Sequence, residues 1–225
     1  TVIDFDSQFD GKMNKIIKSE TCHQNFINGI GKLKIMKPQL QKGHKKAAVL
    51  VPLVQTDELA LLFTVRSYLL SAHRGEICFP GGIKDDVDVT LEDTATRETR
   101  EEIGLDPNLI NIWGHMPPVP NRLGNVEITP YVGLCEHFHS NELSINVSEV
   151  SKAIVFPVSK LCDPKVLGYT QFRGPKRSYS LPLFHIGKYR IWGITAVITH
   201  HLLKLIVPTL YRPTLKFIPP INHTG

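Results

Sequence analysis

The spacing of hydrophobic positions changes near residue 45. Residues 1–44 are mostly polar, and their one regular feature is an apolar stripe formed by Phe26, Ile30 and Leu33. Side chains three and four positions apart share one face of a helix, so this stripe predicts a helix over residues 21–36. We therefore expect one helix in an otherwise weakly patterned N-terminal region.

From Ala47 onward the chain contains short apolar runs that are rich in β-branched residues. Residues 47–54 and 59–66 are two such runs, and the polar residues 55–58 between them are typical of a turn. This pattern predicts two neighbouring strands. Further strands are expected at residues 76–79, 110–115, 126–135 and 151–156.

The C-terminal part predicts a hairpin over residues 179–192, turning at residues 187–188, and a final helix over residues 195–206 that stops before Pro208. Strands and helices follow one another without a regular βαβ alternation. The fold class predicted from this order is α+β, with helices packed on a mixed sheet.

Composition sets limits on this picture. The 225 residues are 42% hydrophobic and 21% charged, which is ordinary for a globular chain with one buried core. We expect an N-terminal extension with one helix (1–44), one domain (45–213) and a C-terminal tail (214–225). No apolar run approaches the length of a membrane span, so none is expected. The oligomeric state cannot be read from the sequence.

Charge and cysteine content indicate neither a nucleic-acid partner nor a disulfide framework. The net charge is +5, and six lysines precede the first strand, at positions 32, 34, 37, 42, 45 and 46. Such a group attracts polyanions, but it is more often a solvated segment, and no RNA-binding motif or aromatic series supports a nucleic-acid partner. The four cysteines are widely spaced without a C-x-x-C pair, which is typical of free thiols.

Residues 91–102 are predicted to form a helix with both ends marked in the sequence. Thr90 and Asp93 have the spacing of a capping box, in which each side chain bonds the backbone N–H of the other residue. Gly104 stands where a helix C-terminus favours a left-handed backbone. We expect the last turn of this helix to carry the chemistry of the protein.

Three glutamates, Glu98, Glu101 and Glu102, occupy this last turn. Positions i, i+3 and i+4 fall within about 100° of one helix face, so the carboxylates repel one another unless a cation lies among them. Oxygen ligands suit Mg²⁺ or Mn²⁺. Arg97, one turn before Glu101, can hold and orient that carboxylate. The alternative is a solvated charged face, which is common on exposed helices.

The surroundings of this turn resemble the Nudix box, a glycine followed by a glutamate and an Arg-Glu-x-x-Glu-Glu helix. The matching residues are Gly82, Arg97, Glu98, Glu101, Glu102, Gly104 and Leu105. Asp88 stands where the first glutamate belongs, eight residues rather than seven separate it from Arg97, and Thr99 replaces an aliphatic residue. The resemblance implies an α/β/α sandwich that hydrolyses a nucleoside diphosphate linked to another group.

The same resemblance implies roles for the acidic turn. Glu98 and Glu102 would be the main ligands of Mg²⁺ or Mn²⁺, and Glu101 would be a second ligand or the group that polarises water. Arg97 would orient Glu101. The segment from Asn146 to Glu149 resembles one that precedes a late strand in these hydrolases, so Glu149 is a further candidate carboxylate, with a surface role as the alternative.

Upstream of the box, residues 61–82 resemble the signature of the coenzyme A diphosphatase branch of the family. Its matching residues are Arg66, Ser67, Gly75, Phe79, Pro80, Gly81 and Gly82, whereas Ser71 occupies the place of a second arginine and Arg74 follows three positions on. The substrate-binding residues implied are Arg66, Ser67, Arg74, Phe79, Gly81 and Gly82. Arg66 and Arg74 would contact phosphates, and the alternative for Arg66 is a surface charge paired with a carboxylate.

The expected activity is therefore hydrolysis of coenzyme A and acyl-CoA. Alternatives are the same chemistry on NADH, ADP-ribose or an oxidised nucleotide, and a binding module that has lost catalysis. Residues 168–213 resemble the mitochondrial coenzyme A diphosphatases more than the peroxisomal ones. That resemblance implies a mitochondrial location, with the peroxisome or cytoplasm as alternatives.

Overall fold

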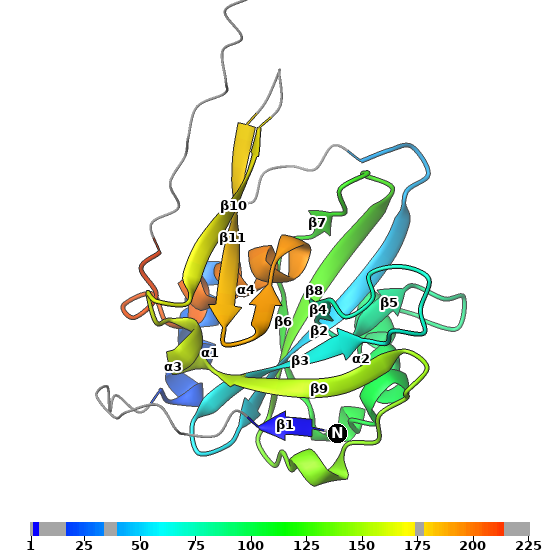
Figure 1. Ribbon diagram of the computed structural model, residues 1–225. Helices are drawn as coiled ribbons and strands as arrows, with labels where there is room; N and C mark the ends of the chain where they lie inside the picture. The colour runs from blue at the N-terminus through cyan, green and yellow to red at the C-terminus, as the bar shows by residue number, and fades with distance from the viewer. Residues whose placement is uncertain (1, 5–16, 34–39, 174–177, 214–225) are drawn as a thin grey trace, which may run out of the picture.

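A large mixed sheet forms the centre of the computed structural model, which describes residues 2–4, 17–33, 40–173 and 178–213 (Figure 1). Its strands run in the order β1-β9-β3-β2-β8-β6. Their bounds are Val2–Asp4 (β1), Val150–Pro157 (β9), Leu59–Arg66 (β3), Lys45–Gln55 (β2), Val126–Cys135 (β8) and Asn111–His115 (β6). The pairs β1–β9 and β2–β8 are parallel, and the other pairs on this path are antiparallel.

Three short strands extend this sheet. They are β4 (Ile77–Cys78) on β3, β5 (Gly81–Ile83) on β2 and β7 (Val119–Pro120) on β8. Strands β1, β5 and β7 were not predicted, because two or three residues carry too little periodicity. Pairing with a neighbouring strand makes them strands.

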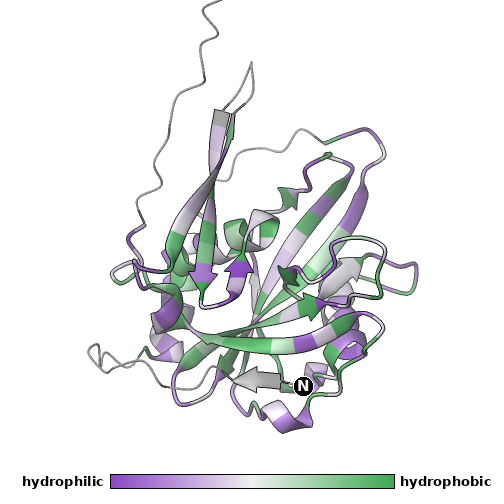
Figure 2. Ribbon diagram, viewed as in Figure 1, coloured by the Kyte–Doolittle hydropathy of each residue, from purple (hydrophilic) through white to green (hydrophobic). Residues whose placement is uncertain are grey.

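Both faces of the main sheet are buried. Along β3, Leu59, Leu61 and Phe63 point into one core cluster, while Ala60 and Leu62 point into another. This follows from the strand geometry, since successive side chains point to opposite faces. A strand that is buried on both faces needs other elements on both sides, and Figure 2 shows hydrophobic residues along the central part of β3 and β9.

Helices cover the two faces unequally. Helix α2 (Leu91–Ile103) packs on one face, against β2 and β5, whereas α1 (Ser19–Ile30) and α4 (Gly193–Ile206) pack together on the other (Figure 1). The remaining helical turns are α3 (Val158–Leu161) and the 3-10 turns η1 (Pro107–Leu109) and η2 (Ser140–Glu142). The α+β sandwich with a mixed sheet is thus confirmed.

A second sheet lies over the face that carries α4. It consists of β10 (Leu167–Arg173), β11 (Ser178–Ile186) and β12 (Tyr189–Ile191), all antiparallel. The hairpin turning at residues 187–188 is confirmed, whereas β10 was not predicted. Strand β11 packs on α4 and β12 packs on β4, so this small sheet connects the C-terminal helix with the main sheet.

The first helix differs from its prediction. Helix α1 begins at Ser19 and ends at Ile30, not near residue 36, because the chain turns at residues 31–32. Residues 34–36 of the predicted helix lie outside the described residues, as do Lys34 and Lys37 of the lysine group and the tail 214–225. Cys22 and Phe26 of α1 are almost fully buried in the main core. The division at residues 44 and 213 stays a prediction.

Smaller predictions agree with the structure. The final helix begins at Gly193 and ends at Ile206, and all four cysteines are free thiols. None of the helices in the described ranges has the length and apolar character that a membrane crossing requires.

Candidate active site

Helix α2 has the ends that its sequence predicts. Thr90 Oγ1 accepts a hydrogen bond from the Asp93 N–H at 3.1 Å, and the Asp93 carboxylate accepts one from the Thr90 N–H at 2.7 Å. Gly104 closes the helix with φ of 71°. Thr99 is fully buried on the inner face, where its hydroxyl donates to the Ala95 carbonyl at 2.7 Å. This internal bond satisfies a polar side chain at a usually aliphatic position.

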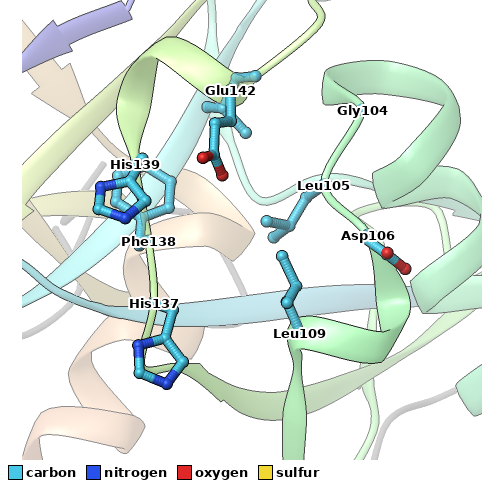
Figure 3. A pocket seen from close by; sticks show the side chains of 9 residues that line it. Gly104, Leu105, Asp106, Leu109, His137, Phe138, His139 and Glu142 are labelled. Atoms are coloured by element: carbon cyan, nitrogen blue, oxygen red, sulfur yellow. The ribbon is translucent and has the colours of Figure 1, made fainter.

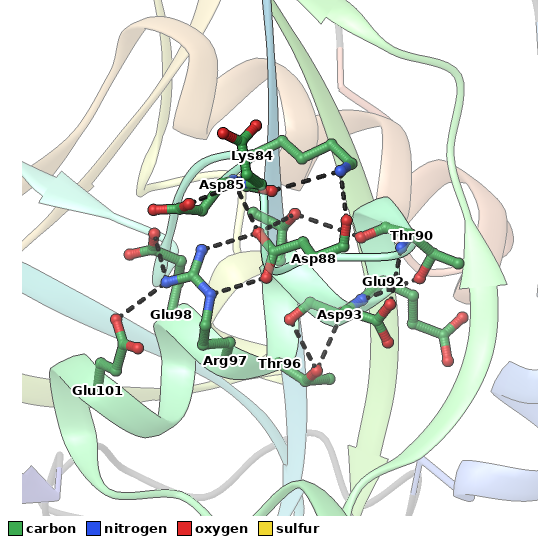
Figure 4. Close-up of polar contacts among 12 residues, drawn as sticks. Lys84, Asp85, Asp88, Thr90, Glu92, Asp93, Thr96, Arg97, Glu98 and Glu101 are labelled. Carbon is green, nitrogen blue, oxygen red and sulfur yellow. Dashed lines mark hydrogen bonds and ion pairs between the residues drawn. The ribbon is translucent and has the colours of Figure 1, made fainter.

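Asp88 holds Arg97 through a forked pair of bonds. Arg97 Nε donates to Asp88 Oδ1 at 2.8 Å, and the terminal nitrogen Nη2 donates to Oδ2 at 2.9 Å (Figure 4). Asp88 is only 4% exposed and also accepts bonds from the Asp85 N–H and the Thr94 hydroxyl. The bonds from Arg97 keep the pKa of Asp88 well below its usual range. Asp88 has a shorter side chain than the glutamate of the Nudix pattern, and the loop between Asp88 and Arg97 is one residue longer. With both changes, the Asp88 carboxylate still reaches the Arg97 guanidinium.

The remaining nitrogen of Arg97 contacts two glutamates of the helix. Nη1 lies 3.0 Å from Glu98 Oε1 and 3.0 Å from Glu101 Oε2 (Figure 4). The expected contact between Arg97 and Glu101 is present. The Glu101 side chain is 53% exposed, whereas that of Glu98 is 18% exposed. Arg97 therefore links the buried loop at Asp88 to the carboxylates of the last turn.

Glu102 is the most buried of the three glutamates, at 5% exposure. Its carboxylate accepts a hydrogen bond from the Gly81 N–H. Burial, followed by the negative charge of Glu98, raises the pKa of Glu102 to about 8. Burial likewise raises the pKa of Glu98, against the opposing charge of Arg97. A site with two such carboxyls favours a proton or another cation.

The two glycines of β5 lie directly against these carboxyls. Gly81 has φ of 151°, and a Cβ there would lie 2.3 Å from the Ala48 carbonyl oxygen. A Cβ on Gly82 would lie 2.4 Å from the carboxyl group of Glu98. Only glycine permits this close approach of strand to helix. The predicted Gly81–Gly82 loop therefore forms one wall of the site.

Glu149 also belongs to this site. The loop before it is attached to the C-terminal end of α2, because the Ser144 N–H donates to the Ile103 carbonyl and the Asn146 N–H donates to the Glu102 carbonyl, each at 2.9 Å. The charge of Glu149 raises the pKa of both Glu98 and Glu102. The structure thus brings a candidate carboxylate that is remote in sequence to the acidic turn.

Arg66 and Cys78 lie beside Glu102. The positive charge of Arg66 lowers the pKa of Glu102, and Arg66 also interacts with the Cys78 thiol. Arg66 Nε is buried without a hydrogen-bond partner. Cys78 Sγ lies 3.2 Å from the Thr64 hydroxyl, and burial raises the pKa of the thiol to about 11, so it stays neutral. Cys78 was not predicted as a site residue. It directly precedes Phe79 in the predicted strand 76–79, and neighbouring strand residues point to opposite faces of a sheet, so the alternation could have indicated that Cys78 and Phe79 face different sides.

Three predicted substrate contacts are engaged within the protein. The Ser67 hydroxyl donates to the Val147 carbonyl at 2.8 Å, which joins two loops beside the site. Phe79 is 4% exposed, with its ring stacked on Phe63 at 4.7 Å between centroids. Arg74 lies on an exposed turn, where its Nε donates to the Leu70 carbonyl. Their roles in binding substrate stay predictions.

The donor set fits a hard divalent cation, although no ligand group is preassembled. Within the described ranges, no three His, Cys, Asp or Glu side chains converge closely enough to hold an ion. Arg97 spans Glu98 and Glu101, while Glu102 is bonded to the Gly81 backbone. Nevertheless, the raised pKa of Glu102 and the facing charge of Glu149 leave a local excess of carboxylate oxygen. Such oxygens are the ligands that Mg²⁺ and Mn²⁺ prefer.

Two hollows flank α2. One of about 540 Å³ lies on its outer side, lined by Val87, Asp88, Asp93, Thr96, Arg97, Arg100, Glu101 and Pro107. The other, of about 180 Å³, lies beyond the C-terminal end of the helix between Leu105, Leu109 and Phe138, with His137 and His139 beside it (Figure 3). The second hollow contains none of the predicted site residues.

An acidic helix whose arginine contacts its glutamates, next to a glycine pair in a mixed sheet, agrees with a Nudix domain. The NUDIX domain family model matches residues 44–173, and the chain belongs to this family. It is 41% identical over 172 residues to a mouse (Mus musculus) protein named mitochondrial coenzyme A diphosphatase NUDT8, covering 75% of this chain and 81% of that relative. It is 36% identical over 185 residues to Nudix hydrolase 3 of Caenorhabditis elegans, covering 75% and 76%.

A solved structure shares the fold at low sequence identity. The MutT/nudix family protein from Enterococcus faecalis superimposes with a TM-score of 0.51 at 16% identity, covering 89% of this chain and 76% of that one. The agreement extends beyond the matched domain to most of the chain. At this identity the similarity concerns the fold alone.

Proposed function

We propose that this chain is a diphosphatase of coenzyme A and its acyl thioesters. One water molecule adds across the pyrophosphate bond and releases 3′,5′-ADP and 4′-phosphopantetheine or its acylated form. Two findings support this assignment: the 41% identity to the mouse mitochondrial coenzyme A diphosphatase, and the signature that runs from Arg66 to Gly82. The observation that carries the chemistry is the carboxyl pair formed by buried Glu102 and half-buried Glu98, beside an arginine, Arg66, with an unpartnered Nε.

Nudix hydrolases generally need divalent metal ions, and we propose Mg²⁺ or Mn²⁺ for this chain. Glu98 and Glu102 would hold the ion, with Glu101 or Glu149 as a further ligand. When bound, such an ion neutralises charge on the pyrophosphate and lowers the pKa of a coordinated water.

The other residues of the site bind and position. Arg66 would contact pyrophosphate oxygens, since its guanidinium lies beside Glu102 and a forked cation suits phosphate. Gly81 and Gly82 allow the backbone to approach the substrate closely. Arg97, held by Asp88, restricts the positions of Glu98 and Glu101, so that these carboxylates need little reorganisation during the reaction.

We place the activity in mitochondria, as in the name of the mouse relative. The substrate is a small molecule, and we expect no nucleic-acid partner, because the sequence contains no RNA-binding motif or series of base-stacking aromatic residues. These assignments are tested by locating the tagged full-length protein in cells. An exclusively peroxisomal or cytoplasmic signal would overturn the placement.

The direct test is mass spectrometry of products from coenzyme A incubated with the protein and Mn²⁺. Equal amounts of 3′,5′-ADP and 4′-phosphopantetheine are expected, and neither should form with the Glu102→Gln variant. NADH and ADP-ribose serve as comparison substrates under the same conditions. Faster hydrolysis of either one, or binding of coenzyme A without products, would overturn the proposal.

A further inference from the structure

The loop at residues 144–149 leads into strand β9 and carries Glu149. Its first half is attached to the last turn of α2, because the Asn146 N–H donates to the Glu102 carbonyl at 2.9 Å. The loop then closes on itself: the Asn146 carbonyl accepts bonds from the N–H groups of Glu149 and Val150, at 3.0 and 2.8 Å. These bonds order the backbone around Glu149, but they do not fix its distance from strand β3.

The second half of the loop is attached to the end of β3 by Ser67. The Ser67 hydroxyl donates to the Val147 carbonyl, and the Ser67 N–H donates to the Glu149 carbonyl, each at 2.8 Å. Ser67 is only 3% exposed, and it directly follows Arg66, the cation beside Glu102. One buried residue therefore uses both of its hydrogen-bond donors to hold the loop of Glu149.

These bonds lie where the pairing of β3 with β9 becomes irregular. The register of the two strands shifts between Val65 and Arg66, and Arg66 lies opposite Val150, the first residue of β9. Ser67 and Glu149 lie just beyond the two strands. Such irregularities often occur beside active sites, where they change the direction of a side chain. The Ser67 bonds therefore fix the backbone at a point where the regular ladder does not.

The Ser67 hydroxyl has no hydrogen left to donate to a substrate in this arrangement. A hydroxyl group donates one hydrogen, and the Val147 carbonyl accepts it here. Phosphate oxygens are acceptors, so a direct contact with a phosphate would need the same hydrogen and would release the loop. The geometry therefore favours a role through the loop over a direct role in binding.

The position of Glu149 matters because its charge acts on both inner glutamates. The charge contributes to raising the pKa of Glu98 and of Glu102. Charge interactions fall with distance, and small displacements of a reacting group have large effects on rate. A loop that moves away from β3 would thus change the oxygen atoms that surround the acidic turn.

We propose that Ser67 is a positioning residue for Glu149: its hydroxyl and its N–H hold residues 147–149 so that the Glu149 carboxylate stays at the acidic turn. The proposal rests on the proposed function and deepens it. It assigns Ser67 a role other than the substrate contact that the sequence predicts.

The kinetic test is a double-mutant cycle of Ser67→Ala and Glu149→Gln, measured as coenzyme A hydrolysis with Mn²⁺. Ser67→Ala should lower kcat about tenfold and leave KM within about twofold, because the loop moves while the substrate contacts remain. Glu149→Gln should lower kcat about 100-fold. The double variant should be no slower than Glu149→Gln alone, since Ser67 acts through that carboxylate.

Ser151→Ala is the matched control. The Ser151 hydroxyl donates to the Val65 carbonyl at 3.3 Å, so it joins the same two strands within their paired region. Removing this hydroxyl deletes a hydrogen bond of the same kind without releasing the loop. The variant should therefore keep kcat within about twofold of the wild type.

A second measurement needs no substrate. Hydrogen exchange followed by mass spectrometry reports how often the backbone bonds at residues 146–150 open. Ser67→Ala should speed exchange in a peptide that covers these residues about tenfold, whereas Ser151→Ala should change it about twofold or less. Circular dichroism spectra that match the wild type confirm that each variant is folded.

Several outcomes would overturn the positioning role. A KM raised about tenfold at unchanged kcat would identify Ser67 as a substrate contact, and a wild-type kcat in Ser67→Ala would leave it without a role. A double variant about tenfold slower than Glu149→Gln would show that the two residues act independently. Unchanged exchange in Ser67→Ala overturns the role whether or not the protein hydrolyses coenzyme A. Conversely, faster exchange in a protein that leaves coenzyme A intact retains Ser67 as the residue that holds Glu149 and rejects the diphosphatase.

Discussion

A buried titratable side chain from each of the two helical layers can be compared, and the two side chains differ in what surrounds them. Glu102 on α2 is 5% exposed and His200 on α4 is 8% exposed. Burial is the main cause of both shifts: it raises the pKa of Glu102 to about 8 and lowers that of His200 to about 4. Each group is thereby driven toward its neutral form.

The difference lies in their partners. His200 Nδ1 shares a hydrogen bond of 2.9 Å with the Tyr211 hydroxyl, in a region where α4 is packed on an apolar core. Glu102 instead faces two further carboxylates, Glu98 and Glu149, which add to its shift. Burial alone therefore does not mark a functional group. A buried group such as Glu102, whose neighbours carry the same charge, favours binding of a cation. A buried group such as His200, which already has a hydrogen-bond partner, has a structural role.

Of the substitutions that test this comparison, the one at Glu102 should have the largest effect on activity. Glu102→Gln removes a carboxylate ligand but keeps the shape and the bond from Gly81, so activity should fall about 10³-fold or more while the protein stays folded. Coenzyme A hydrolysis with Mn²⁺ and thermal melting measure the two effects. Activity within about tenfold of wild type would contradict the assignment.

The second effect is the pH dependence of stability that His200 contributes. The pKa of His200 is about 4 in the folded protein, below the ordinary histidine value of about 6.5, so the unfolded chain takes up the proton first as pH falls. The stabilisation is complete above pH 6.5 and is lost as pH falls through about 4, by up to about 3 kcal/mol. Urea unfolding between pH 7 and 4 measures this loss.

Two variants sharpen this measurement. His200→Gln should show a shallower decline of the unfolding free energy between pH 6.5 and 4 than the wild type. His73→Gln, which changes a histidine with a 69% exposed side chain, should leave the decline unchanged. Parallel pH profiles for wild type and His200→Gln would show that burial does not lower the pKa of His200.

A smaller loss is expected at Asp88. Asp88→Asn removes the negative charge that holds the Arg97 fork and should lower the free energy of unfolding by about 2 kcal/mol, together with a reduced kcat. Urea denaturation and steady-state kinetics measure these changes. Asp86→Asn, in the same loop but exposed, is the matched control. Equal stability of the two variants would remove the anchoring role of Asp88.

The smallest expected effect is on stability, and it distinguishes the cost of a strained backbone from the cost of a steric clash. Gly104 and Gly187 both have positive φ, 71° and 57°, but a Cβ on Gly104 would lie 2.8 Å from Ser144 Cβ, whereas one on Gly187 would meet nothing within 4 Å. Alanine at Gly104 should therefore lower stability by about 1–2 kcal/mol, and alanine at Gly187 by less. Thermal unfolding compares them, and the reverse order would contradict this account.

Helix α2 could be predicted closely because its signals are local. The capping residues Thr90 and Asp93 bond each other across one turn, and Gly104 needs only its own backbone to end the helix. The long apolar strands were predictable for the same reason, since periodicity is a property of neighbouring residues. The contact between Arg97 and Glu101 follows from helix geometry.

The remaining features depend on contacts between distant residues. In the sequence, Asp88 is a departure from the Nudix pattern. Its two hydrogen bonds with Arg97 form only because the loop folds back on the helix. Ser67 and Phe79 have side chains suited to a substrate, but a carbonyl from residue 147 and the ring of Phe63 engage them first.

The sequence by itself determined the acidic helix, its boundaries and the family. Only the tertiary structure decided which carboxyls are buried, that Glu149 faces them, and that Ser67 bonds the loop of Glu149. The physical reason is that charge interactions and burial depend on distance in space. A chain reveals those distances only after strands far apart in sequence have paired.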